Sequence, residues 1–137
     1  MIFVDAGAFI ARYRPSDQHH RAAMRGWNER RARQDPLVTR QLVLFEASKL
    51  PGAMFGNRFA ADRFEEWLSS TRLQTIRTTP EVDLQAIALW RKFADQAISG
   101  VDCVSFVLMR RLRIKRAFAF DKHFAIAGFE LWPPAGK

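Results

Sequence analysis

Short apolar runs along the chain alternate with stretches whose apolar residues recur every three or four positions. The apolar runs predict five short strands, at residues 2–4, 36–39, 73–77, 116–120 and 129–132. Helical spacing predicts helices at residues 8–11, 16–34, 41–54, 57–70, 79–95 and 99–112, and Pro51-Gly52 is expected to break the third. Strands separated by helices favour parallel pairing. The fold class expected is therefore α/β, a three-layer α/β/α sandwich with a short, mostly parallel central sheet.

Composition narrows the class of protein. The 137 residues are expected to form a single domain (1–137), and 48% of them are apolar, including 12 Phe, so the chain can bury a real core. The single cysteine, Cys103, excludes a disulfide framework and suits a reducing cytoplasm. No signal peptide is expected because Asp5 interrupts the amino terminus, and no stretch approaches the roughly 18 apolar residues of a membrane span.

The charge balance is strongly basic. There are 22 Lys and Arg against 14 Asp and Glu, which gives a net charge of +8 and a pI near 10.8. This excess favours polyanionic partners, nucleic acid before membrane. The densest basic run is either a solvated helix end or a contact with RNA phosphates, and comprises Arg110, Arg111, Arg113, Lys115 and Arg116.

Two carboxylates follow apolar strands directly. Asp5 ends the run Ile2-Phe3-Val4, and Asp121 ends the run that begins at Arg116. Open α/β sheets place their ligand sites at the carboxyl ends of such strands. The alternative for Asp5 is that it only caps the helix that follows.

Two further carboxylates fall on predicted helices. Glu46 has Leu42, Val43 and Leu50 as its helical neighbours, so it shares the face expected to pack on the sheet. An ionised carboxylate there requires a partner cation or a shifted pKa, and an ion pair with an arginine is the structural alternative. Asp102 lies three residues after Ser99, and a capping box is its alternative.

The functional interpretation explains these four carboxylates together. Two strand ends and two helices that meet at one edge of the sheet would place four like charges within a few ångströms, and a divalent cation would neutralise them. Ligation by oxygen alone favours Mg²⁺, with Mn²⁺ also suitable, over zinc. On a basic protein, such a site can hold a phosphodiester and activate water for its hydrolysis.

Four segments of the chain resemble the motifs of a known family: residues 4–8, 39–46, 101–106 and 120–129. In this order and spacing they resemble a PIN domain, and more narrowly the VapC-type ribonuclease toxins of toxin–antitoxin pairs. The resemblance implies a Mg²⁺-dependent endoribonuclease that cleaves RNA through metal-activated water. It also implies a cognate antitoxin, a homodimer and a cytoplasmic location, with the long arginine-rich second helix and the helix at 57–70 as the elements that face the antitoxin.

By match to the family motif, the acidic catalytic and metal-site residues would be Asp5, Glu46, Asp102 and Asp121, with Thr39 and Ser105 as supporting residues. One departure is that Ala6-Gly7 stand where many members carry a hydroxyl side chain. His123 is expected at the surface or in a cap, with a contact to substrate as the alternative. Two other classes stay open: a non-catalytic RNA-binding or scaffold domain with a PIN-like fold, and a metal-dependent nuclease that acts on DNA.

Overall fold

A five-stranded parallel sheet forms the centre of the molecule. The computed structural model describes residues 1–135, and its strands pair in the order β3-β2-β1-β4-β5, each pair parallel. The strands are β1 (Ile2–Val4), β2 (Leu37–Arg40), β3 (Leu73–Ile76), β4 (Arg116–Phe118) and β5 (Glu130–Trp132). All five strands predicted from the apolar runs are therefore present, and the α/β class is confirmed.

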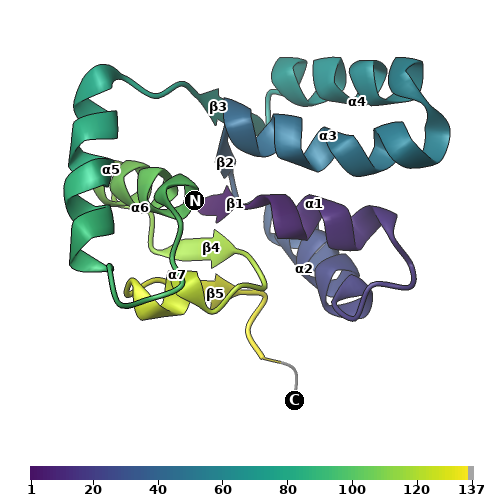
Figure 1. Cartoon of the computed structure of the whole chain (residues 1–137). Helices are drawn as coiled ribbons and strands as arrows, with labels where there is room; N and C mark the ends of the chain where they lie inside the picture. The colour runs from purple at the N-terminus through teal and green to yellow at the C-terminus, as the bar shows by residue number, and fades with distance from the viewer. Residues whose placement is uncertain (136–137) are drawn as a thin grey trace.

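Helices cover both faces of this sheet, as Figure 1 shows. On one side lie α1 (Ala6–Tyr13), α2 (His20–Arg33), α3 (Gln41–Phe55) and α4 (Asn57–Ser69). On the other side α5 (Pro80–Lys92) packs on α6 (Gly100–Arg111), and the single turn α7 (His123–Ile126) follows β4. This is the expected three-layer sandwich.

The burial of the strands in the core explains why their sequences are unbroken apolar runs. Every residue of β1 and β2 is buried, because a parallel sheet covered on both faces has no solvent side. The largest fully buried side chains include Phe3 from β1, Leu44 from α3, Phe106 from α6 and Phe118 from β4. Phe124 of α7 closes the core at ring-centroid distances of 5.0 Å from Phe106 and 6.4 Å from Phe3.

Three details differ from the sequence-based prediction. The expected break at Pro51-Gly52 is wrong: α3 continues through Pro51 to Phe55. An interior proline costs a helix about 3 kcal/mol, but Pro51 is buried and α3 packs along α4, and this burial offsets the cost. The turn α7 was not predicted, and β4 ends at Phe118 rather than at residue 120.

The strand order places a topological switch point between β1 and β4. From β1 the chain adds β2 and then β3 on one side, and afterwards β4 and β5 on the other. In open α/β sheets, ligands bind outside the carboxyl ends of the strands at such a point. Asp5 and Asp121 follow the two strands that flank it. Among the described residues, no helix is long and apolar enough to cross a bilayer.

Candidate active site

Asp5 lies at the junction between β1 and α1, at the switch point. Its backbone N–H donates to the carbonyl of Phe118 at 3.0 Å, which extends the pairing of β1 with β4. Asp5 occupies the N-cap position of α1, yet its carboxylate makes no capping hydrogen bond. The helix-cap interpretation of Asp5 therefore finds no support in its contacts, and the carboxylate remains available to a ligand.

The pKa of Asp5 shows that it is buried and that other negative charges act on it. Burial raises the pKa of Asp5 from 3.8 to about 7, against a backbone hydrogen bond from Ala6 that lowers it. This value already includes the negative charges of Asp102, Glu46 and Asp121, which also raise the pKa of Asp5, in that order. The charges of Asp102, Glu46 and Asp121 therefore all act on Asp5, although among the described residues only Asp102 and Asp121, with His123, bring ligand atoms within 4.8 Å of one another.

His123 joins two of these carboxylates. Its Nδ1 lies 3.1 Å from Oδ2 of Asp102 and 2.9 Å from Oδ2 of Asp121, and its backbone N–H donates to Oδ1 of Asp121 at 2.8 Å. One ligand atom from each of these three residues lies within 4.8 Å of the others, which is a spacing that a metal ion can bridge. The turn α7 thus fixes the positions of Asp102 and Asp121 relative to each other.

Asp102 also has the structural role that its sequence pattern suggested. The hydroxyl of Ser99 accepts from the N–H of Asp102 at 3.1 Å, and the carboxylate of Asp102 accepts from the N–H of Ser99 at 3.5 Å, so a capping box begins α6. The same Oδ2 atom contacts His123. Capping and membership of the cluster are therefore compatible, because the first turn of α6 points at the sheet edge.

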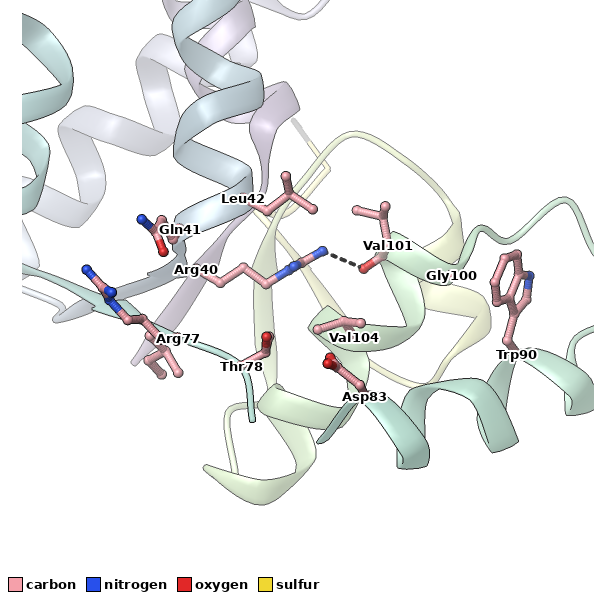
Figure 2. Close-up of a pocket in the computed structure, with 11 residues that line it drawn as sticks. Arg40, Gln41, Leu42, Arg77, Thr78, Asp83, Trp90, Gly100, Val101 and Val104 are labelled. Atoms are coloured by element: carbon pink, nitrogen blue, oxygen red, sulfur yellow. Dashed lines mark hydrogen bonds between the residues drawn. The ribbon is translucent and has the colours of Figure 1, made fainter. Parts of the chain in front are cut away.

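A buried arginine borders the cluster. Arg40, at the end of β2, donates from Nε to the hydroxyl of Ser105 at 3.1 Å and from Nη2 to the carbonyl of Val101 at 2.9 Å (Figure 2). Burial lowers its pKa, whereas the carboxylates of Glu46, Asp5 and Asp102 raise it, in that order. Arg40 is thus a fixed cation in the field of the acidic cluster.

The two supporting hydroxyls hold the frame of the site. Thr39 is fully buried, and its Oγ1 donates to the carbonyl of Val4 at 2.7 Å, which ties the end of β2 to the residue before Asp5. Ser105 is buried on α6 and accepts from Arg40. The hydroxyl of Thr39 therefore holds the backbone at Val4, and the hydroxyl of Ser105 holds the side chain of Arg40.

Sequence reasoning did not select Arg40 or His123 as site residues. The signal for Arg40 was available: it lies at the carboxyl end of a buried strand, where a charged side chain is as unusual as Asp5. The signal for His123 was weaker, because its partner Asp102 is 21 residues away in the chain. The expectation that His123 would be only a surface or capping residue was wrong, since it is half-buried between two carboxylates.

The dense basic run lies away from the acidic cluster. Arg111 ends α6 nine residues after Asp102, roughly 13 Å along the helix axis. Its Nη2 pairs with Glu81 at 2.9 Å, and Arg116 pairs with Glu130 at 3.5 Å. These ion pairs are exposed, so the run has the character of a solvated helix end.

Comparison with known proteins gives consistent matches. The PIN-domain family profile matches residues 2–130. The chain is 34% identical over 130 residues to the 23S rRNA-specific endonuclease VapC20 of Mycobacterium tuberculosis strain CDC 1551 / Oshkosh, covering 94% of this chain and 95% of that protein. The match to the VapC20 of strain H37Rv has the same identity and coverage.

A solved structure matches over the same length. The crystal structure of Mycobacterium tuberculosis VapC20, described as a Sarcin-Ricin loop cleaving toxin, superposes with a TM-score of 0.80 and 30% sequence identity. The match covers 94% of this chain and 96% of that structure. Both the sequence and the arrangement of the elements are therefore shared with this protein.

Proposed function

Because this chain belongs to the PIN-domain family and is an endoribonuclease toxin of the VapC type, we propose that its clustered carboxylates form a Mg²⁺-dependent active site for ribosomal RNA. The residues of this site are Asp5, Glu46, Asp102 and Asp121. The observation that carries the proposal is the gathering of Asp102, Asp121 and His123, whose ligand atoms lie within 4.8 Å of one another at the switch point between β1 and β4. The raised pKa of Asp5, caused by burial and by the charges of three other carboxylates, agrees with a site that takes up a cation.

The donor set fits a hard divalent cation. All four acids offer oxygen atoms, which suits Mg²⁺ or Mn²⁺ better than the softer metals. When bound, the cation would neutralise the carboxylates and stabilise charge on the phosphate that is attacked. Asp5 and Asp102 would hold it most directly, while Glu46 and Asp121 would act through water, complete a second site or orient the nucleophile.

His123 would serve as a positioning residue in this site. Its ring holds the carboxylates of Asp102 and Asp121 together, and its backbone N–H fixes one oxygen of Asp121. Arg40 would keep the first turn of α6 in place through the carbonyl of Val101. These contacts fix the acids before substrate binds, so little reorganisation is needed when the phosphodiester enters.

The substrate we propose is the sarcin–ricin loop of 23S rRNA, because VapC20 is a 23S rRNA-specific endonuclease and a sarcin–ricin loop cleaving toxin. Identity of 34% over 94% of this chain, together with the shared fold, supports a similar RNA. The net charge of +8 supports binding to a large polyanion such as a ribosome.

We also propose a cognate antitoxin and a homodimer, both acting in the cytoplasm. The surface formed by α3 and α4 exposes large apolar side chains, among them Phe45, Phe55 and Leu68. Exposed apolar groups of this size favour a protein partner. The arginines of α2, which packs on α1, would attract an acidic segment of the antitoxin.

Expression in a bacterial host tests the proposed function. Induction of the wild-type chain is expected to arrest growth and to produce one new end in 23S rRNA, mapped by primer extension. The Asp121→Ala variant is expected to accumulate as folded protein without arrest and without the new end. Arrest that persists in this variant, or arrest of the wild type with intact 23S rRNA, would contradict the proposal.

A further inference from the structure

A cavity of about 470 Å³ lies beside the acidic cluster, at the same edge of the sheet (Figure 2). Arg40 and Ile76 line it from the ends of β2 and β3, and Asp83 and Trp90 from α5. Val101 and its neighbours on α6 complete the wall. Sites for small molecules have volumes of roughly 300 to 1,000 Å³, so this cavity has room for one nucleotide and not for a duplex.

The cavity and the acidic cluster share a wall. Val101 lines the cavity and directly precedes Asp102, and the carbonyl of Val101 accepts a hydrogen bond from Arg40 at 2.9 Å. Arg40 also lines the cavity while the charges of Glu46 and Asp5 act on it. An RNA chain whose scissile phosphate lies at the acids therefore has this cavity as the adjacent place for a neighbouring nucleotide.

The lining combines an apolar wall with cations and hydrogen-bonding groups. Leu42, Val101 and Val104 contribute the apolar part, and the indole of Trp90 lies half exposed at one end of the cavity. Trp90 is held against Gly100, where an added Cβ would come within 2.7 Å of the ring. A positioned aromatic face next to an apolar wall is suited to a nucleobase, since base–aromatic stacking tolerates every base.

The opposite end of the cavity carries the charge. Arg77 is exposed there, next to Thr78 and Gln41, in the position that Figure 2 shows across from Trp90. A guanidinium and a hydroxyl together suit a phosphate group. Asp83 adds an acceptor for the N–H groups of a base.

We propose that this cavity is a nucleotide subsite that holds one nucleotide of the RNA next to the scissile phosphate. The base lies along Trp90 and the apolar wall, and its phosphate contacts Arg77. The proposal rests on the proposed function, because the occupant is part of the RNA that the acids cleave. Trp90 and Arg77 are then residues that bind the substrate beside the scissile phosphate.

Binding of mononucleotides in EDTA tests the subsite without requiring cleavage. The probes are AMP, GMP, CMP and UMP, titrated into the full-length chain while tryptophan fluorescence is followed. At least one is expected to quench the fluorescence, and Trp90→Phe is expected to remove most of that quench, since Trp27 and Trp132 are buried and the partly buried Trp67 does not line the cavity. Arg77→Ala is expected to weaken binding roughly fivefold or more, and Arg91→Ala, an exposed arginine next to Trp90 that does not line the cavity, is the matched control.

Steady-state cleavage provides the second measurement. Trp90→Ala is expected to raise KM roughly fivefold to a hundredfold, with kcat much less affected. Arg91→Ala should leave both constants unchanged. If no mononucleotide binds, or if Trp90 and Arg77 variants bind and cleave like the wild type, the subsite does not exist.

The same experiments separate this proposal from the proposed function. Asp121→Asn is expected to lose cleavage and to keep mononucleotide binding, because Asp121 does not line the cavity. If mononucleotides quench the fluorescence of the wild type but the wild type does not cleave RNA, the proposed nuclease site is refuted and the subsite is retained. Cleavage with no quenching, and with KM unchanged in Trp90→Ala, would overturn the subsite alone.

Discussion

Replacement of Asp5 by asparagine is expected to stabilise the metal-free protein at neutral pH while abolishing its nuclease activity. Asparagine has the size of a protonated aspartate and carries no charge, so it removes the cost of ionising Asp5 among three other acids. The folded-state pKa of Asp5 is about 7 against an ordinary 3.8. The folded chain therefore binds the Asp5 proton more tightly than the unfolded chain does.

The magnitude follows from the linkage between proton binding and folding. The stabilising contribution of protonated Asp5 is full below pH 3.8 and is lost as the pH rises to about 7. At about 1.36 kcal/mol per pKa unit, the loss amounts to about 4 kcal/mol. The free energy of unfolding of Asp5→Asn should thus equal that of the wild type near pH 4 and exceed it by up to about 4 kcal/mol at pH 8.

Urea denaturation in EDTA between pH 4 and pH 8 measures this difference. Added Mg²⁺ should then stabilise the wild type and leave Asp5→Asn unchanged, because only the wild type has the full set of ligands. A variant that is no more stable than the wild type at pH 8 would refute the electrostatic account of the cluster. A difference that does not change with pH would refute it equally, since another cause would then be at work.

Three further outcomes are expected. The affinity for Mn²⁺, measured by calorimetry, should rise as the pH increases toward 7, because binding releases the Asp5 proton; a flat profile would contradict this. Arg40→Met should lower the free energy of unfolding, measured in urea, by about 3 kcal/mol, because it leaves the carbonyl of Val101 and the acids without their buried cation. A loss below about 0.5 kcal/mol would contradict this role of Arg40. Gly26→Ala should lower the free energy of unfolding by about 1 to 2 kcal/mol, because its Cβ would lie 2.8 Å from the ring of Phe118. Gly7→Ala is the control: its Cβ would meet no atom within 4 Å, so thermal melts should show a stability equal to or above that of the wild type.

The order and type of the elements could be predicted because each has a local cause. Apolar runs such as Ile2–Val4 have no polar side because the sheet is covered on both faces, and the helices carry their own periodicity. The turn α7 spans only four residues, too few to show a period. The continuation of α3 past Pro51 depends on its packing against α4, which local sequence does not record.

Part of the candidate site could likewise be predicted from the sequence, and part could not. Asp5 and Asp121 could be placed at strand ends, but the adjacency of β1 and β4 is a property of the strand order, which the sequence does not state. The contact of His123 with Asp102 depends on the packing of α7 against α6, which the sequence does not state either. Arg40 was missed because arginine usually lies at the surface, although its place at the end of a buried strand was a signal; the fold adds that Arg40 is buried and bonded to the carbonyl of Val101.

The central claim is that the four clustered carboxylates make this chain a metal-dependent endoribonuclease. The most direct measurement is the cleavage rate of a synthetic RNA stem-loop of sarcin–ricin sequence by purified wild type and by Asp121→Asn, each with Mg²⁺ and with EDTA. The account predicts cleavage by the wild type with Mg²⁺, none in EDTA, and a rate at least about a hundredfold lower for a folded Asp121→Asn. Cleavage at the wild-type rate in EDTA, or by Asp121→Asn, would contradict it.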